Sequence, residues 1–284
     1  MTLRIAVQSK GRLFEETMEL LKEAGIKLNN KKRTLLIPAK GLPIEVLFLR
    51  DDDIPQAVAT GVADIGIVGE NEYAEKNENA NIIKRLGFST CRLSLAIPKN
   101  EEYNDVSWFN GRKIATSYPN ILSKFLEKNN LKSDIHIITG SVEISPSIGL
   151  SDAIFDIVSS GGTLVSNRLK EVEVVMYSEA ILIANNDLAS EKQAILDDLI
   201  FRIEAVQAAM DKKYIMLNTP KEKLDDIIRL LPGMRSPTVT PLAEEGWCSV
   251  QSVICDKEFW RIIADLKAQG AEGILVLPIE KMIL

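Results

Sequence analysis

The chain has 284 residues, of which 46% are hydrophobic and 26% charged, which is enough apolar material for about two globular domains. Its formal net charge of -6 excludes a basic surface over the whole chain of the kind that binds nucleic acid, so an anionic ligand must be held by local features. The three cysteines have no CxxC spacing, and the single histidine, His136, excludes a multi-histidine metal site.

The N-terminal segment has no basic stretch followed by an apolar run of signal-peptide length. No uncharged apolar run approaches the roughly 18 residues that a membrane span needs. We therefore expect a cytoplasmic protein with neither a membrane nor a nucleic-acid partner. His136 lies in an apolar run, which favours a place in the core or at a strand edge.

Short apolar runs alternate with helical patterns at the start of the chain. Strands are predicted at residues 3–8, 44–49 and 64–69, and helices at residues 13–24 and from near Pro55. Asp51, Asp52 and Asp53 precede the second helix, where we expect them to cap it. This alternation favours a parallel α/β sheet.

A second α/β unit is predicted from Cys91 onwards. Its strands are expected at residues 91–98, 112–115, 135–139 and 156–158, and its helix at residues 120–129. The extended residues 172–184 then return to the first unit. A chain that leaves one sheet, builds a second and comes back makes two lobes with a cleft between them. The expected lobes are residues 1–90 with 180–210, and residues 91–179.

The pattern changes after a helix predicted at residues 189–210. Strands at 214–217, 237–241, 248–255 and 273–277 alternate with helices at 221–231 and 257–268. The order βαββαβ is that of the ferredoxin-like arrangement. Residues 211–284 are therefore expected to form a third domain, and they contain no histidine and no phosphate loop.

The most informative segment is an acidic and apolar stretch that ends in SSGGT at residues 159–163. Its glycines allow a phosphate to approach the backbone, while hydroxyls and N–H groups at the start of a following helix donate to phosphate oxygens. Asp152 and Asp156 precede this loop and suit ribose hydroxyls or Mg²⁺. The absence of GK[ST] and GxGxxG disfavours a kinase or a dehydrogenase. The alternative is a plain glycine-rich turn with solvated aspartates.

Several motifs occur in a specific order: SKGRL at 9–13, LRDDDIP at 49–55, DIGIVGEN at 64–71, RLSLAIP at 92–98, IATSYPN at 114–120, GSVEISP at 140–146 and SPT at 236–238. Together they resemble the long form of the ATP phosphoribosyltransferase family over the length of the chain. The resemblance implies an α/β fold of two periplasmic-binding-protein-like lobes (type IV phosphoribosyltransferase). It also implies a C-terminal ferredoxin-like (ACT-like) regulatory domain.

The resemblance implies transfer of the phosphoribosyl group of phosphoribosyl pyrophosphate to N1 of the adenine of ATP, with release of pyrophosphate, as the first step of histidine biosynthesis. It implies Mg²⁺ as cofactor, held mainly by the substrate, and histidine as inhibitor. It also implies a homo-oligomer, dimeric or hexameric, without a separate regulatory subunit. Such a displacement needs no protein nucleophile, so the protein's tasks are alignment and charge neutralisation.

Residue roles follow from the same resemblance. The catalytic candidates are Lys10, Arg12, Arg50 and Asp152. The residues expected to bind phosphoribosyl pyrophosphate are Glu143, Asp152, Ala153, Asp156, Ser159, Ser160, Gly161, Gly162 and Thr163. Those expected to bind ATP are Gly11, Arg50, Glu70, Asn71 and Tyr118. The histidine effector is expected to contact Asn218, Ser236, Thr238 and Gly273.

Other interpretations remain open from the sequence. One alternative is that Lys10 and Arg12 are solvated residues of a surface loop, although they follow the end of the first strand, where open α/β sheets bind ligands. Arg50 can pair with the adjacent aspartates, and Tyr118 can serve packing rather than stack on adenine. The whole chain can be a two-lobed small-molecule binding module without catalysis, or a different phosphoribosyltransferase, and the C-terminal domain can be purely oligomerising.

Overall fold

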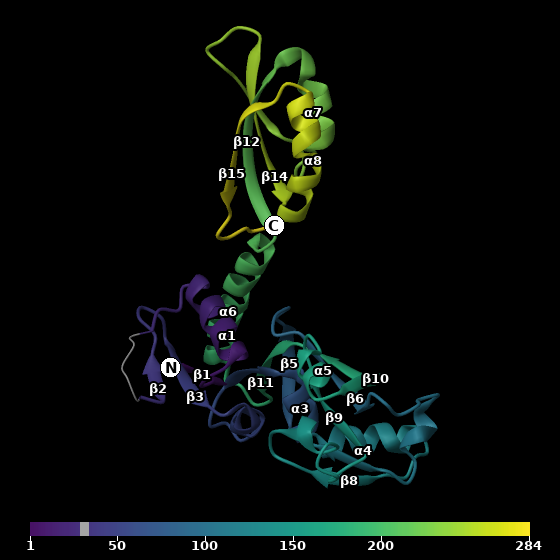
Figure 1. Cartoon of the computed structure of the whole chain (residues 1–284). Helices are drawn as coiled ribbons and strands as arrows, with labels where there is room; N and C mark the ends of the chain where they lie inside the picture. Colours follow the sequence, from purple (N-terminus) through teal and green to yellow (C-terminus); the bar gives the residue numbers. More distant parts are fainter. Residues whose placement is uncertain (29–33) are drawn as a thin grey trace. The chain divides into compact units, whose positions relative to one another are not determined.

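The computed structural model describes residues 1–28 and 34–284 (Figure 1). The chain divides into two compact units, one formed by Met1–Glu19 and Ile26–Ile195, the other by Leu20–Gly25 and Leu196–Leu284. The first unit contains a six-stranded and a five-stranded sheet, and the second contains a four-stranded sheet.

The six-stranded sheet has the strand order β2 (Leu36–Pro38), β3 (Ile44–Leu49), β1 (Leu3–Gln8), β4 (Ile65–Gly69), β11 (Ala180–Asn185) and β5 (Ala80–Arg85). β1 is parallel to β3 and β4, whereas β11 is antiparallel to β4 and β5. The predicted return of the chain to its first sheet is therefore confirmed. The central strands are nearly continuous runs of buried aliphatic residues, as expected for strands covered on both faces.

Three helices belong to this sheet: α1 (Arg12–Glu23), α2 (Ile54–Ala59) and α3 (Glu70–Lys76). Helix α2 packs directly on β4 at Gly66, where an added β-carbon would lie only 2.7 Å from Ile54 and 2.9 Å from Val58. This glycine therefore sets how closely the helix approaches the sheet. Helix α3 begins directly after β4, so its first residues stand at the carboxyl end of a central parallel strand.

The five-stranded sheet has the order β10 (Leu169–Ser178), β6 (Cys91–Pro98), β9 (Ala153–Val158), β7 (Lys113–Thr116) and β8 (Asp134–Ile137). Helix α4 (Pro119–Lys128) and the core residues Phe109, Leu122 and Phe155 pack with it. Short helical segments η2 (Val106–Phe109), η3 (Val142–Ile144) and α5 (Gly162–Ser166) complete this part. His136 lies on the edge strand β8, 2.9 Å from Asp134, which confirms its predicted place at a strand edge.

The C-terminal domain is the part of the second unit that follows helix α6 (Ser190–Ala209). It contains β12 (Lys212–Pro220), η4 (Lys221–Lys223), α7 (Leu224–Leu230), β13 (Thr238–Pro241), β14 (Trp247–Cys255), α8 (Asp256–Ala268) and β15 (Glu272–Pro278). The sheet order β13-β14-β12-β15, with every pair antiparallel, confirms the βαββαβ prediction. Both helices lie on one side of the sheet (Figure 1) and cover Ile215, Leu217 and Val250. Within the described residues, no helix is long and apolar enough to cross a bilayer.

The structure corrects one local expectation. The three aspartates form a 3₁₀ turn, η1 (Asp51–Asp53), and do not cap α2. Asp53 occupies the N-cap position with φ -90° and ψ -19°, and its side chain makes no capping hydrogen bond. A capping side chain requires extended backbone at that residue, so the helical dihedrals of Asp53 explain the failure. The Asp51 carboxylate accepts instead from the Gln8 side chain at 3.3 Å and from the Asp52 N–H at 3.1 Å.

A buried carboxylate joins α3 to α4. The two oxygens of Glu75, a side chain only 6% exposed, accept from the N–H groups of Asn120 and Ile121, each at 2.9 Å. These donors belong to the first turn of α4, where backbone N–H groups have no partner within the helix. Tyr118, the N-cap residue of α4, gives no capping hydrogen bond, so Glu75 caps this helix from outside.

Substitution of Glu75 by Ala should lower the free energy of unfolding by about 2–3 kcal/mol, because it leaves buried N–H donors without a charged acceptor. Chemical denaturation followed by circular dichroism measures this change. Glu127→Ala on the exposed side of α4 is the matched control and should stay within about 0.5 kcal/mol of the parent protein. Equal effects of the two substitutions would contradict the capping role.

Candidate functional site

A first cavity, of about 150 Å³, surrounds the loop of residues 159–163. The loop leaves the carboxyl end of β9 and enters α5, and Gly161 adopts a left-handed conformation with φ +82°. A β-carbon is strained at such a φ, so the turn favours glycine. Arg92 fixes the start of the loop by donating to the carbonyl oxygen of Ser159 at 3.2 Å. The structure thus builds the predicted loop with its backbone facing a cavity.

Two carboxylates line this first cavity. Asp156 comes from β9, accepts from the N–H of Ile157 at 2.8 Å, and lies with Glu143 of η3 on the cavity wall. Burial, together with the neighbouring carboxylate of Glu143, raises the pKa of Asp156 to about 6, while the hydrogen bond from the Ile157 N–H acts in the opposite direction. The structure therefore brings together Glu143, Asp156 and the loop, as predicted from separate stretches of sequence.

A second cavity, of about 250 Å³, lies where the central parallel strands of the six-stranded sheet end. Its walls come from the segments that follow β1, β3 and β4, and from residues 89–91. Ligands of open α/β sheets bind at this end of the strands. Ile157 and Ser159 line both cavities, so the second cavity adjoins the first at the end of β9.

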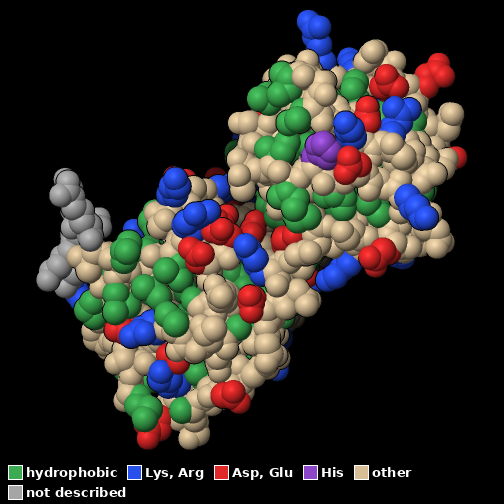
Figure 2. All heavy atoms as spheres, turned by 90° about the horizontal axis from the view of Figure 1, so that it is seen from below, with side chains coloured by type: hydrophobic (Ala, Val, Ile, Leu, Met, Phe, Trp, Pro, Cys, Tyr) green, Lys and Arg blue, Asp and Glu red, His purple; other side chains and the backbone are tan. Residues whose placement is uncertain are grey.

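The cavity walls carry more acidic than basic side chains. Arg12 is the one Lys or Arg among the described residues that line either cavity, whereas Asp51, Glu72, Glu143 and Asp156 are the acids. The Arg12 guanidinium pairs with Glu16 at 3.2 Å. Acidic and basic side chains are interspersed over the face of the molecule shown in Figure 2.

The other basic candidates lie outside the cavity walls. Lys10 is exposed in the turn between β1 and α1, next to Gly11 with φ +95°. The Arg50 side chain is 75% exposed and lies 3.1 Å from the carboxylate of Asp52. The predicted ion pair with an adjacent aspartate is therefore present, and Arg50 has room to meet a ligand at the rim beside Asp51.

A buried polar network holds the base of the second cavity. The Tyr118 hydroxyl donates to Glu72 at 2.8 Å and accepts from the Asn71 side chain at 3.2 Å. The Ser178 hydroxyl donates to Asn71 Oδ1 at 2.9 Å and accepts from the Asn71 N–H at 3.0 Å. Asn71 and Tyr118 are therefore already engaged with protein groups.

This network corrects the expected role of Tyr118. Tyr118 is 7% exposed and belongs to the core of the five-stranded sheet, so the structure favours the packing interpretation over stacking on adenine. Glu70, another expected ATP ligand, instead forms a two-pronged ion pair with Arg85 and does not line the cavity.

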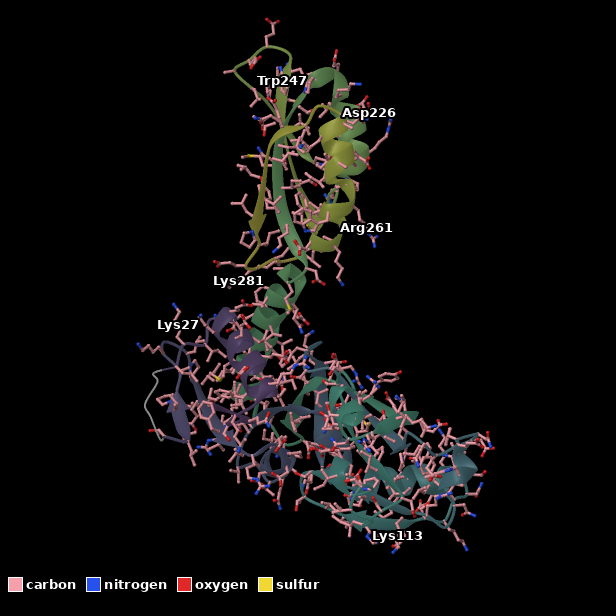
Figure 3. The ribbon with its side chains drawn as sticks, in the orientation of Figure 1. Lys27, Lys113, Asp226, Trp247, Arg261 and Lys281 are labelled. Atoms are coloured by element: carbon pink, nitrogen blue, oxygen red, sulfur yellow. The ribbon has the colours of Figure 1, made fainter. Side chains whose placement is uncertain are left out.

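Asp152 and Ala153 are also misplaced by the sequence prediction. Both stand at the start of β9, whereas the loop follows the end of this strand. Six residues of extended chain place the loop roughly 20 Å from Asp152 and Ala153. The Asp152 carboxylate accepts from the N–H of Lys113 at 2.8 Å, and Lys113 is labelled on the five-stranded sheet in Figure 3. Ala153 is fully buried. The structure therefore removes both residues from the loop site.

Glu72 is an acidic cavity residue that the sequence analysis missed. It directly follows the DIGIVGEN motif and stands in the first turn of α3. Burial raises the pKa of its carboxyl group above the ordinary range. The one sequence feature that could have indicated Glu72 is its position just beyond the end of a buried strand.

The expected effector residues lie on two parts of the C-terminal sheet. Gly273 neighbours Asn218 on β12, since an added β-carbon would lie 3.3 Å from the Asn218 side-chain nitrogen. Thr238 pairs with Gln251 of β14, a strand that lies between β13 and β12, and Ser236 precedes it. A cavity of about 560 Å³ in this unit is lined by other residues, among them Arg261, labelled in Figure 3.

Comparison with known proteins agrees with this architecture. Residues 50–205 match the family described as ATP phosphoribosyltransferase, and residues 209–281 match the HisG C-terminal domain. Proteins named ATP phosphoribosyltransferase from Parabacteroides distasonis and Bacteroides fragilis are 72% and 69% identical to this chain, respectively. Both alignments cover 99% of this chain, and they cover 99% and 100% of the two relatives.

Among solved structures, an ATP phosphoribosyl transferase (HisG:HisZ) complex from Thermotoga maritima contains a similar chain, with a TM-score of 0.62 and 29% identity. The match covers 72% of this chain and 99% of that one. The fold is that of a phosphoribosyl-transferring enzyme. The chain belongs to the ATP phosphoribosyltransferase family.

Substitution of Asp156 by Asn should stabilise the ligand-free protein above pH 6, by up to about 3 kcal/mol. The folded-state pKa is raised, so the folded protein retains a proton that the unfolded chain has lost; stability of the parent therefore falls as pH rises from about 4 to about 6. Thermal unfolding between pH 4 and 8 measures the difference, which should vanish at the acid end. A variant less stable than the parent at pH 8 would contradict this assignment.

Proposed function

We propose that the protein transfers the phosphoribosyl group of phosphoribosyl pyrophosphate to N1 of the adenine of ATP and releases pyrophosphate, the first step of histidine biosynthesis. The observation that carries this proposal is the shared wall of the two cavities at Ile157 and Ser159. Two ligands bound in adjoining cavities meet there, which is the geometric requirement of a direct displacement. Membership of the family supplies the substrates.

The first cavity suits phosphoribosyl pyrophosphate. Backbone N–H groups and the hydroxyls of Ser159, Ser160 and Thr163 supply donors for a phosphate, and Gly161 and Gly162 let it approach. Glu143 and Asp156 face the same cavity and suit the ribose hydroxyls, which donate hydrogen bonds to carboxylates.

Mg²⁺ fits this arrangement as an ion carried by the substrate. Within the described residues, no three His, Cys, Asp or Glu side chains form a metal-binding group, but Glu143 and Asp156 offer oxygen ligands on one wall. When bound, the ion would neutralise the departing pyrophosphate. The raised pKa of Asp156 is consistent with a carboxylate that awaits a cation or a donor.

The second cavity suits ATP. Arg12 lines it, and Gly11, Lys10 and Arg50 stand in the turns at its rim, where guanidinium and ammonium groups can pair with the triphosphate. We assign alignment and charge neutralisation to these residues. A binding module without catalysis would hold the same ligands and leave both unchanged, so formation of pyrophosphate from ATP and phosphoribosyl pyrophosphate with Mg²⁺ decides between the two functions.

Gly161→Val should abolish detectable binding of phosphoribosyl pyrophosphate, because a β-branched residue is strained at φ +82° and should distort the loop that lines the cavity. Isothermal titration calorimetry on the folded variant measures this binding. Gly111→Val is the matched control, since Gly111 also has a positive φ, +74°, in open space but lies in another turn. Unchanged binding by the Gly161 variant would refute the loop site.

The C-terminal unit is proposed to be regulatory. We assign residues 1–90 with 180–210 and residues 91–179 to the catalytic lobes, and residues 211–284 to a domain that binds histidine. The similar chain from Thermotoga maritima comes from a complex with HisZ, and its match covers 72% of this chain. We propose that this C-terminal domain lets the protein, a cytoplasmic homo-oligomer (dimer or hexamer), respond to histidine without a separate subunit.

Asn218→Ala should raise the histidine concentration needed for half-inhibition by at least about tenfold, the effect of losing one hydrogen bond to a charged ligand. Initial rates across a histidine titration measure it, and uninhibited rates should stay normal because an effector acts by its preference between global states. Asn104→Ala, at an exposed position of the first unit, is the control. A parent enzyme indifferent to millimolar histidine would remove the regulatory assignment.

A further inference from the structure

We propose that Glu72 is a catalytic carboxylate of the transfer reaction: it accepts a hydrogen bond from the amino group of adenine and stabilises the positive charge that the ring acquires as its N1 attacks the ribose. Tyr118 is the positioning residue that holds this carboxylate. The inference rests on the proposed function and assigns a role within the same site.

The geometry fixes Glu72 at the cavity wall. One carboxylate oxygen accepts both from the Tyr118 hydroxyl at 2.8 Å and from Asn71 Nδ2 at 3.3 Å. Asn71 is itself held by Ser178, so the carboxylate is oriented by partners whose own positions are fixed. No hydrogen bond from a described residue engages its other oxygen, and the side chain lines the second cavity.

Glu72 also stands near the place where the cavities adjoin. Burial raises the pKa of the Tyr118 hydroxyl, and the carboxylates of Glu72 and Asp156 raise it further. Tyr118 therefore lies close to an acid of each cavity. A group bound beside Glu72 shares the second cavity with Ile157 and Ser159, which also line the first cavity, where the proposed function places the ribose.

The charges around Glu72 favour a cationic ligand. Asp51 and Asp52 of η1 raise its pKa, Lys76 on α3 lowers it, and Arg12 on the same cavity wall is engaged with Glu16. Within the described part of the chain, no Lys or Arg forms an ion pair with Glu72. A half-buried carboxylate without a counter-ion is poised for a positive charge that appears only during the reaction.

The reaction creates such a charge. The lone pair of adenine N1 forms the new bond to ribose C1, the bond from C1 to the pyrophosphate oxygen breaks, and its electron pair leaves with pyrophosphate. The adenine ring then carries a positive charge that is delocalised onto its amino group, which becomes a stronger donor. A hydrogen bond from that amino group to Glu72 is therefore stronger in the transition state than in the bound substrate, which is the condition for raising kcat.

Glu72→Gln keeps the shape and an acceptor oxygen but removes the charge. It should lower kcat by about 100-fold while the KM for ATP changes only a few-fold, the pattern for an interaction made in the transition state. The rate of the parent should fall as pH drops through the raised pKa of Glu72, because the charged form is required. This fall at low pH is the acid limb of the pH–rate profile, and the variant should lack it. Glu127→Gln on the exposed side of α4 is the control and should match the parent.

Tyr118→Phe tests the positioning role independently of folding. The hydrogen bond from Tyr118 lowers the pKa of Glu72, so its removal should move the acid limb to higher pH and leave most of the rate at the alkaline plateau. A merely structural role for Tyr118 would lower the folded fraction, measured by circular dichroism, without moving the limb.

The outcomes separate the two levels of inference. A parent enzyme that forms no pyrophosphate from both substrates would overturn the proposed transfer and this role with it. If the parent is active and a folded Glu72→Gln variant keeps both kcat and the acid limb, the role of Glu72 alone is overturned. Titration of Asp156 would then account for the acid limb. If Glu72→Gln does not fold, an unmoved acid limb in Tyr118→Phe has the same meaning.

Discussion

The buried polar contacts between α3 and α4 are the interaction on which the rest of the site depends. Helix α3 follows the end of β4, and helix α4 follows the end of β7. These contacts therefore connect the carboxyl ends of strands from two sheets. Glu75 supplies charged acceptors to the start of α4, and Asn71 engages Tyr118. Because each of these groups is desolvated, its partner must stay in place, which keeps the adjoining cavities aligned.

The proposed reaction requires an acidic protein to bind two polyanions. The chain as a whole is negative, and the cavity walls add carboxylates, so attraction by net charge is not the basis of binding. In the proposed reaction, the phosphates would instead meet the donors of the loop 159–163, the Arg12 guanidinium and Mg²⁺ carried by the substrate. The carboxylates instead suit hydroxyls, a metal ion and a cationic adenine, each of which needs an acceptor rather than a donor.

Most of the fold was predictable because strands and helices repeat their apolar residues with different periods. Helix α3 and strand β5 were missed because both are short and mostly polar, and their stability comes from tertiary contacts. Asp152 was misplaced because the strand prediction began at residue 156, whereas β9 begins at Ala153; three further residues of extended chain carry Asp152 to the far end of the strand. Glu72 escaped notice because its partner, Tyr118, is distant in sequence.

The position of β11 has a consequence for biosynthesis on the ribosome. This strand fills the space between β4 and β5, so Ala180 pairs with Gly69 and Asn185 with Ala80. Until β11 emerges, β4 presents an open, apolar edge and β5 has no neighbour in the sheet. The six-stranded sheet therefore cannot be completed before the strands of the five-stranded sheet have been synthesised. This order makes folding slow for a protein of this size and exposes an aggregation-prone strand edge in the nascent chain.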